Sequence, residues 1–418
     1  MIRDIKVIPK DLQLFKFSAY GFLKNQRFFD IFIFLFFLEQ GISFLQIGTL
    51  ISIREIAILI FEIPTGFVAD SLGRRGSMVF AFLSYILSFV IFFFFPGFLL
   101  YIVAMIFFAL GDAFRTGTHK AMILHYLKLN GILHLKVEYY GYTRSWSQMG
   151  SALAALIAGG IVLYSGEYKY IFLGSIIPYI LALILMLTYP KELDGIREHK
   201  EGLINNIRHN FEITFTSLKL SFKEPLLRKA LINSAIFDGL FKTVKDYLQP
   251  ILQMVIISIP LLLGMEKRES ILIAIVYCIL YILTSYASRN SGKLKNKLSS
   301  LSVAVNCTYF AGVSFVFLAG LFFIINLKIV IIILFIILYM LQNLRRPINI
   351  GFISENISHD VMASGLSVES QLKTIFVAVM SPLMGFIADS INIGTAFIIL
   401  SSLTLLILPL IKVSGKKN

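Results

Sequence analysis

The stretch F-E-I-P-T-G-F-V-A-D-S-L-G-R-R-G occupies residues 61–76 and joins two long apolar runs. The first of these runs reaches Pro64, and glycine and charged positions follow it closely. These positions are Gly66, Asp70, Gly73, Arg74 and Arg75. Glycine tolerates backbone angles and close approaches that other residues do not, and arginines beside a membrane span favour the cytoplasmic side. We therefore predict a tight cytoplasmic turn between two membrane-spanning helices.

The composition extends this prediction to the whole chain. Of the 418 residues, 57% are hydrophobic and only 15% are charged, whereas soluble domains average roughly 45–50% apolar and about 25% charged residues. A membrane-spanning helix needs about 20 apolar residues, so twelve such helices with short connections account for most of the chain. We predict an all-α polytopic membrane protein.

The net charge of +14 does not indicate a nucleic-acid partner. The basic residues lie in the joints between apolar runs, which is the pattern that sets membrane orientation. The two cysteines, Cys278 and Cys307, lie inside apolar runs and lack the spacing of metal ligands. We therefore expect no metal, no cofactor and no structural disulfide. The first twelve residues also lack the short apolar core of a removable signal peptide.

The apolar runs fall into two groups of six. The expected spans are 17–39, 44–69, 77–95, 98–119, 141–163, 170–189, 230–258, 270–288, 299–325, 328–349, 365–388 and 393–412. Between the groups, residues 191–229 are rich in charge, and we expect an amphipathic helix near 203–222 on the membrane surface. We predict an N-terminal half of residues 1–190, a cytoplasmic linker of residues 191–229 and a C-terminal half of residues 230–418.

Basic residues concentrate in alternate joints of this arrangement. With the N-terminus inside, the inner joints contain Arg74-Arg75 and the basic segments 120–136, 191–229 and 289–297, while the outer joints contain few basic residues. Positive charge favours the cytoplasmic side. We therefore place both termini in the cytoplasm and predict a multi-pass protein of the cell (inner) membrane.

Several charged residues lie within the predicted spans, where a charge costs at least about 2.5–3.5 kcal/mol on insertion scales. Helical spacing places several of them on shared faces. The candidates for a substrate or proton pathway are Asn25, Arg27, Asp30, Asp112, Arg115, Asp238, Lys242 and Glu369. The first hypothesis is that the helices carrying them turn polar faces to a central pathway. The alternative is that the charges form ion pairs that fix the helices in register, or lie near helix ends and reach the interface.

Part of the opening stretch recurs near the other end of the chain. G-F-V-A-D-S at 66–71 is matched by G-F-I-A-D-S at 385–390, with Pro64 and Pro382 shortly before the two copies. The echo indicates repeated structural units, as in transporters built from repeats, although two short Gly-Asp helix ends can also match by chance. Only the first copy is followed by an arginine pair, Arg74-Arg75.

The pattern G-x-x-x-D-x-x-G-R-R at 66–75, the twelve spans and the long middle segment together resemble the major facilitator superfamily of secondary transporters. The resemblance implies two six-helix halves and a conformational gate in the loop after helix 2. Its gate residues here are Gly66, Asp70, Gly73, Arg74 and Arg75. The stretch 111–121 also resembles helix 4 of bacterial drug-efflux-type members, in which Arg115 matches the intramembrane arginine.

This resemblance implies a secondary active transporter that works by alternating access. The first hypothesis is proton-coupled export of a small lipophilic or amphipathic compound by a monomer in the lipid bilayer. The alternative is an uptake symporter or facilitator for a small polar or charged solute. Family antiporters carry a proline after the glycines of helix 5, and Gly159-Gly160 lack it, which leaves the direction open. The chain lacks hydrolase, metalloprotease and phosphate-loop motifs, so we expect no enzyme.

Overall fold

The structure is a computed structural model that describes residues 9–194, 222–257, 267–289, 300–356 and 359–414. Inside its helices, the side chains at positions 63, 66–72, 137 and 354–366 are not described. All regular secondary structure in the described ranges is helical, which confirms the predicted all-α class. The predicted amphipathic helix near 203–222 lies almost wholly outside the described residues.

Ten helical segments among the described residues are long and apolar enough to cross a membrane. They are Phe44–Glu62, Arg74–Phe94, Phe98–Leu129, Glu138–Ser165, Tyr170–Leu187, Glu269–Ser288, Leu301–Ile324, Lys328–Ile353, Ser367–Ser390 and Ile393–Ile411. The remaining two of the twelve predicted spans, the first and the seventh, are interrupted. α1 (Leu12–Lys24) is separated from α2 (Ile33–Glu39), and a 3-10 turn at Lys245–Tyr247 separates α10 (Pro225–Val244) from α11 (Leu248–Ile257).

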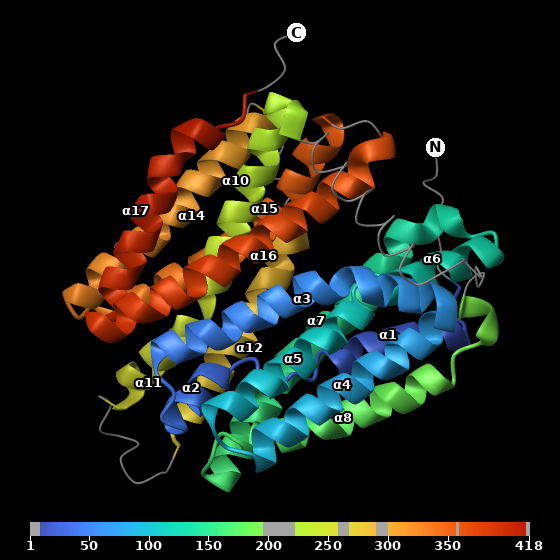
Figure 1. The fold of residues 1–418 in the computed structure, drawn as a ribbon, viewed down its shortest axis with the longest axis horizontal. Coiled ribbons are helices and arrows are strands. Elements are labelled where there is room, and N and C mark those ends of the chain that lie inside the picture. Colours follow the sequence, from blue (N-terminus) through green and yellow to red (C-terminus); the bar gives the residue numbers. More distant parts are fainter. Residues whose placement is uncertain (1–8, 195–221, 258–266, 290–299, 357–358, 415–418) are drawn as a thin grey trace. The chain divides into compact units, whose positions relative to one another are not determined.

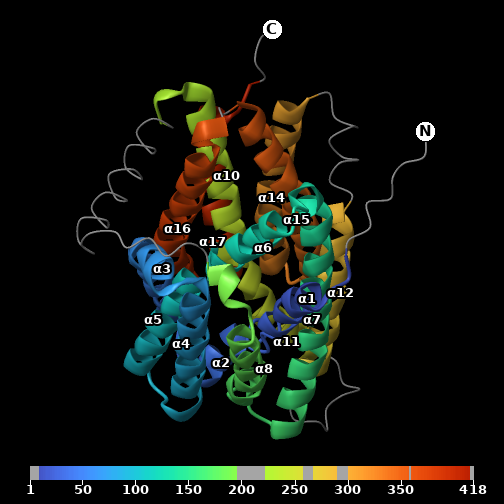
Figure 2. The same ribbon diagram turned by 90° about the vertical axis from the view of Figure 1, so that its right-hand side faces the viewer.

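The chain forms two compact units. The first comprises Met1–Asp30 and Ile60–Ile207. Besides α1 it holds the end of α3 (Phe44–Leu72), together with α4 (Arg74–Phe94), α5 (Phe98–Arg115), α6 (Thr118–Leu129), α7 (Lys136–Ser165) and α8 (Tyr170–Leu187). In this unit α4 packs along α5 and α8, and α1 packs along α7 (Figure 2). The packing brings the interrupted end of α1 and the polar end of α5 into the same unit.

The second unit comprises Ile31–Leu59 and Arg208–Asn418. It holds α2, the first part of α3, α10, α11, α12 (Glu269–Arg289), α14 (Leu301–Ile324), α15 (Lys328–Asn356), α16 (His359–Ser390) and α17 (Ile393–Ile411). α14 lies beside α15 and α17, and α10 lies beside α16 (Figure 1). A residue near the middle of α3 can therefore meet residues of α10 within one unit.

The turn predicted around residues 66–76 is shorter than expected. α3 continues through Pro64 to Leu72, and Gly73 alone separates it from α4. Gly73 has a φ of 90°, a conformation that only glycine adopts readily. The second copy of the motif also lies within a helix, because α16 continues through Pro382 to Ser390. Both copies are therefore helix ends rather than loops.

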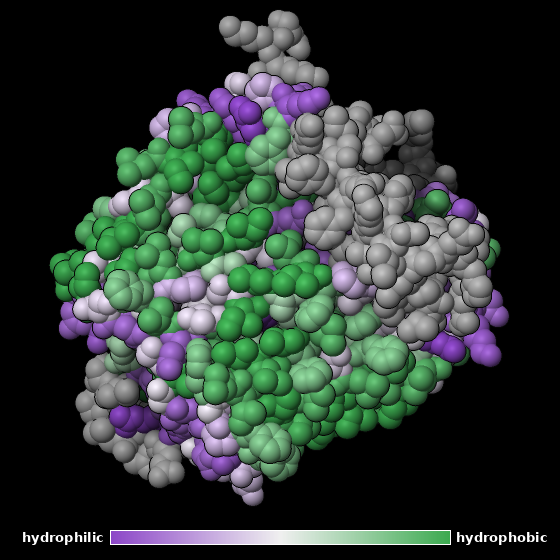
Figure 3. Space-filling model, viewed as in Figure 1, coloured by the Kyte–Doolittle hydropathy of each residue, from purple (hydrophilic) through white to green (hydrophobic). Residues whose placement is uncertain are grey.

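The helix surfaces are strongly apolar. Figure 3 shows hydrophobic side chains covering much of the visible face of the described helices. Large side chains such as Leu406 and Leu410 on α17 are 74% and 72% exposed. Contiguous exposed apolar surface of this kind marks contact with a membrane or a partner, and its place on helices of spanning length favours lipid.

Candidate functional site

The interruption of the first span places charged residues in irregular backbone. After α1 ends at Lys24, the Asn25 amide donates a hydrogen bond to the Gly21 carbonyl at 2.7 Å, and Gln26 donates to the Gly150 carbonyl at 3.2 Å. Irregular backbone at membrane depth is tolerated only where it is buried in protein or lines a cavity. The sequence predicts an unbroken helix over 17–39, and the structure corrects this prediction. Asn25 ties the chain to its own helix, while Arg27 follows in the irregular segment.

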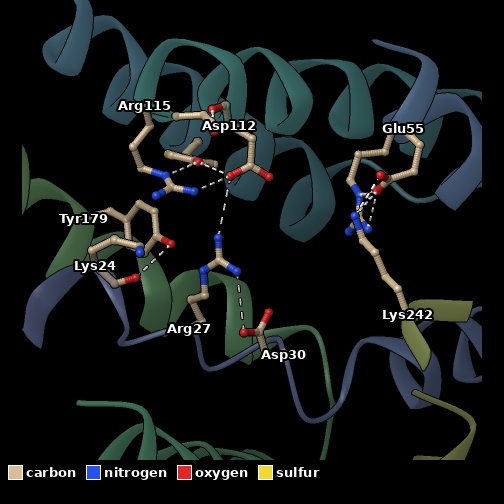
Figure 4. Close-up of polar contacts among 11 residues, drawn as sticks. Lys24, Arg27, Asp30, Glu55, Asp112, Arg115, Tyr179 and Lys242 are labelled. Carbon is tan, nitrogen blue, oxygen red and sulfur yellow. Dashed lines mark hydrogen bonds and ion pairs between the residues drawn. The ribbon is translucent and has the colours of Figure 1, made fainter. Parts of the chain in front are cut away.

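We call Arg27, Asp30, Tyr85, Asp112 and Arg115 the Asp112 cluster (Figure 4). Arg115 Nη2 lies 2.9 Å from Asp112 Oδ1, and the Tyr85 hydroxyl donates to the same oxygen at 2.5 Å. Arg27 lies 3.7 Å from both Asp112 and Asp30, and Arg115 Nε donates to the Tyr85 hydroxyl at 2.9 Å. The predicted pathway residues of the first and fourth spans therefore meet, with Asp112 as the shared acceptor.

Aromatic rings enclose this cluster. The Arg27 guanidinium lies 5.8 Å from the ring centroid of Phe29 and 5.9 Å from that of Phe108. The negative faces of such rings attract a cation. The Nε atom of Arg27 is nevertheless buried and has no hydrogen-bond acceptor among the described groups. The arrangement holds charges at fixed positions in an apolar surrounding, where an electrostatic interaction is stronger than in water.

We call Arg54, Glu55 and Lys242 the Glu55 cluster (Figure 4). The Lys242 ammonium donates to both carboxylate oxygens of Glu55 at 2.8 and 2.7 Å, and Arg54 lies 2.9 Å from Oε1. The Glu55 side chain is only 1% exposed. The predicted pathway set contains Lys242 but omits Glu55. Its position in the apolar run I-S-I-R-E-I-A-I-L-I at 51–60 is the signal that identifies it, since a carboxylate there requires a partner.

The charged residues of α10 and of the 3-10 turn that follows it have separate partners. The spacing of Asp238, Lys242 and Asp246 predicts one face, but Lys242 binds Glu55 and Asp246 binds Lys245 at 2.5 Å. The 3-10 turn at the end of α10 interrupts the helical face between them. Asp238 instead accepts a hydrogen bond from the Gln342 amide at 3.0 Å.

The hydrogen-bond partner of Glu369 on α16 is a neutral hydroxyl group. It accepts a hydrogen bond from the Ser234 hydroxyl at 3.3 Å, and Asn349 donates to the same hydroxyl at 3.2 Å. Neither Glu369 nor Asp238 forms an ion pair within 4.0 Å with a residue that the structure describes. The two carboxylates are therefore unlike Asp112 and Glu55, which each have cationic partners.

Arg345 is a buried cation that the pathway set omits, because it lies near the expected end of its span. Its side chain is fully buried. It donates to the Thr308 hydroxyl at 2.7 Å, to Asn233 Oδ1 and to the Val305 carbonyl, and its guanidinium lies 4.5 Å from the Phe237 ring centroid. These contacts connect α15 to α10 and α14, so Arg345 stabilises the packing of the second unit.

The predicted gate residues are described in part. Arg75 N–H donates to Asp194 Oδ1 at 2.8 Å, and its guanidinium donates to the Tyr189 carbonyl at 2.9 Å. Arg74 donates to the Ala121 carbonyl at 3.4 Å. Arg75 thus fixes the start of α4 against the segment after α8, and Arg74 connects it to α6. The side chain of Asp70 and the surroundings of Gly66 lie outside the described part of the chain.

The described residues contain no group of three or more His, Cys, Asp and Glu side chains placed to hold a metal ion. Their polar clusters consist of carboxylates, cations, hydroxyls and amides in an apolar surrounding. Such clusters can bind a polar solute or take up and release a proton.

A family model described as Major Facilitator Superfamily matches residues 25–372. The chain is also 29% identical, over 241 residues, to an uncharacterized MFS-type transporter, YxaM, of Bacillus subtilis strain 168. That match covers 57% of this chain and 57% of the relative, so it spans just over half the length of the curated protein.

Solved structures share the fold over nearly the whole chain. The nucleoside transporter NupG superposes with a TM-score of 0.73 at 11% identity, covering 96% of this chain and 98% of that one. A D-xylose-proton symporter superposes with a TM-score of 0.71 at 14% identity, and the match covers 97% of this chain and 98% of the symporter. A POT family transporter in complex with a thioalcohol-conjugated peptide superposes with a TM-score of 0.66 at 16% identity. That match covers 95% of this chain and 96% of the transporter. At these identities the likeness concerns the fold.

Proposed function

This chain belongs to the Major Facilitator Superfamily, and on that premise we propose that it is a secondary active transporter that couples solute movement to protons by alternating access. The moving units of this proposal are the six-helix halves 1–190 and 230–418, joined by the linker 191–229. We place the transporter in the cell membrane as a monomer with both termini in the cytoplasm. Its partners are the lipid bilayer, protons and a small solute.

The observation that supports proton coupling is a contrast among the carboxylates within the predicted spans. Asp238 and Glu369 have hydroxyl and amide donors, and no described cation lies within ion-pairing distance of them. A carboxylate held by neutral donors can take up a proton without breaking an ion pair. Ionisable groups in such places mark proton relays and ion pathways in transporters. We propose Asp238 and Glu369 as the proton-carrying pair.

The solute class follows from the two cationic clusters. Arg27, Arg115 and Lys242 place partly exposed cations in the spans of the proposed pathway, and a lipophilic solute offers a cation no polar partner. The geometry therefore favours the polar or charged solute of the alternative hypothesis. Proton-coupled export of a lipophilic or amphipathic compound remains a second prediction, based on the likeness of residues 111–121 to drug-efflux members.

Purified protein in liposomes that contain a pH-sensitive dye tests this proposal. A panel of amino acids, dipeptides, nucleosides, sugars and quaternary ammonium compounds is added with a pH gradient imposed in either sense. We expect at least one solute to produce a proton flux, and the gradient that accelerates it gives the direction of coupling. A chain that moves none of these solutes and no protons contradicts proton-coupled transport.

Variants of the proposed carriers sharpen the test. Glu369→Gln and Asp238→Asn should abolish solute-dependent proton flux while solute exchange without a gradient continues, because exchange needs no net proton transfer. Glu167→Gln is the matched control, since Glu167 lies in the turn between α7 and α8 and pairs with Lys169 at an exposed position. Equal losses in all three variants would refute the assignment.

A further inference from the structure

α6 begins where the membrane-spanning part of its segment ends. α5 contains 18 residues and therefore rises about 27 Å, which is close to the hydrocarbon thickness of about 30 Å. Gly117, with a φ of 79°, then breaks the helix before α6 starts at Thr118. Because α5 alone is long enough to cross the hydrocarbon core, α6 falls at the level of the lipid headgroups.

One face of α6 packs against the first unit. The residues that it buries are Thr118, Met122, Ile123 and Leu127. Near the end of α6, the Tyr126 hydroxyl donates a hydrogen bond to Asp11 Oδ2 at 2.6 Å. Asp11 is the N-cap of α1, so the end of α6 lies beside the start of α1 (Figure 1). The position and the buried face of α6 are thus fixed by the unit itself.

The opposite side of this region combines large apolar side chains with cations. Leu129 at the end of α6 and Leu133 in the 3-10 turn that follows are 57% and 44% exposed. The exposed basic side chains next to them in the chain are Lys128, His134 and Lys136. We call these five residues the α6 patch. Leucines and lysines at the headgroup level are typical of helices that bind the membrane interface.

The charge of the α6 patch is not balanced by carboxylates of its own segment. The sequence has no Asp or Glu between Asp112 and Glu138. Glu192 is exposed on the 3-10 helix that packs against α6, but Lys191 directly precedes it and offsets its charge. The patch therefore presents net positive charge together with exposed apolar surface.

The chemistry of the α6 patch matches one kind of partner. Leucines at this depth bury themselves among the glycerol groups and upper acyl chains, while lysine stems extend along apolar surface and bring the ammonium to a phosphate. A soluble anion offers nothing to the leucines, and a zwitterionic lipid offers no net charge to the lysines. An anionic phospholipid satisfies both.

We propose that the α6 patch is an interfacial binding site for the headgroup of an anionic phospholipid. Lys128 and Lys136 bind the phosphodiester and its net negative charge, and Leu129 and Leu133 form the apolar base of the site. The site gives the lipid partner of this chain a defined chemistry and a defined place. The inference depends on the bilayer and not on proton coupling, so either proposal can fail without the other.

Positive charge in this joint also favours a cytoplasmic position during insertion. That role depends on the number of basic residues and is complete once the chain spans the membrane. It requires neither exposed leucines nor a lipid preference of the folded protein. The two roles therefore predict different results when lipid selectivity is measured at the patch.

Quenching by brominated lipids measures which lipid contacts the patch. Trp146 is the single tryptophan, so Trp146→Phe combined with Leu133→Trp places one fluorophore in the patch and keeps a large apolar side chain there. The variant is reconstituted in phosphatidylcholine and titrated with brominated phosphatidylglycerol or brominated phosphatidylcholine. We expect phosphatidylglycerol to bind roughly fivefold more tightly, the gain from one lysine near an anionic surface. Lys128→Gln with Lys136→Gln should remove this preference, and arginine at both positions should keep it.

Two matched controls locate the effect. Tyr164→Trp in the Trp146→Phe background reports the other end of α7, where Tyr164 is 97% exposed beside the ion pair of Glu167 and Lys169. It should show no preference for phosphatidylglycerol. Lys223→Gln removes an exposed lysine of the second unit that directly precedes Glu224, and it should leave the preference at the patch unchanged.

Equal preference at the two tryptophan positions, or a preference that survives the loss of both lysines, overturns the site. Soluble glycerol phosphate should not displace the brominated lipid, and displacement would replace the lipid by a free phosphate compound. Salt at 1 M should lower the preference, because the Debye length falls to about 3 Å. A salt-independent preference would contradict binding through the lysines. If Leu133→Trp impairs folding, Leu129→Trp reports the same patch.

Discussion

Asp112 and Glu55 are two carboxylates within the helices that contact their cations in different ways. Asp112 is 18% exposed and serves two arginines and a tyrosine hydroxyl. Glu55 is 1% exposed and binds Lys242 through both oxygens. The more deeply buried carboxylate has the more flexible partner, since the Lys242 side chain is 30% exposed. In the Asp112 cluster, one carboxylate connects several donors. In the Glu55 cluster, the Lys242 ammonium can reach water when the charge of Glu55 is removed.

The largest effect is expected for Asp112→Ala. The substitution removes the acceptor shared by Arg27, Arg115 and Tyr85, and leaves two poorly solvated guanidinium groups. Breaking a buried ion pair from one side costs about 3–5 kcal/mol. We expect a loss of that size in the free energy of unfolding, measured by denaturant titration of the purified protein. Glu167→Ala, at the exposed pair with Lys169, should change it by about 0–1 kcal/mol. Similar losses in both variants would contradict the network.

Glu55→Gln should destabilise the protein less, although Glu55 is more buried. The Lys242 side chain is 30% exposed, so its ammonium can be solvated after the charge is lost. We expect about 2 kcal/mol, below the range for a fully buried pair, in the same titration. A loss larger than that of Asp112→Ala would reverse the ranking and show that the Glu55 cluster is the more rigid one.

The two clusters also differ in how far the sequence predicts them. Asp112 and Arg115 are three residues apart on one helix, and helical periodicity alone places them together. The Lys242–Glu55 pair joins residues 187 positions apart, and no local pattern indicates which distant carboxylate a lysine will meet. The choice depends on how α10 packs against α3 in three dimensions. The same limit explains why helical spacing alone puts Asp238, Lys242 and Asp246 on one face, although their partners differ.

Fold and helix count follow more directly, because hydrophobicity and length are local properties. The apolar runs predict the ten uninterrupted spans well. They do not predict the break at residues 25–32, which depends on hydrogen bonds from Asn25 and Gln26 to carbonyl groups. Nor do they predict that the Asp389 carboxylate on α16 accepts hydrogen bonds from the Phe44 and Leu45 N–H groups at the start of α3, since an aspartate is compatible with many helix ends. Sites of irregular backbone are where propensity and pattern are expected to fail.

A double-mutant cycle measures the coupling within the Glu55 cluster directly. Lys242→Met leaves Glu55 with Arg54 as its cation, and Glu55→Gln leaves Lys242 without its carboxylate. The double variant removes both charges and should be more stable than the sum of the single losses implies. We expect a coupling free energy of about 1–3 kcal/mol, the upper part of the range for contacting residues, from denaturant titration of all four proteins. A coupling near zero would mean that Lys242 and Glu55 do not interact in the membrane protein.

The smallest effect on stability is expected for Asp30→Asn. Asp30 lies 3.7 Å from Arg27, and its side chain is 36% exposed, so the pair should contribute less than about 1 kcal/mol. Arg27 keeps Asp112 as a partner at the same distance. Solute exchange measured beside unfolding separates two roles for this residue. Reduced exchange with unchanged stability would support Asp30 as part of the pathway, while unchanged exchange would leave it as a local counter-charge. Because the Asp112 network remains intact in this variant, either outcome can be assigned to Asp30 itself.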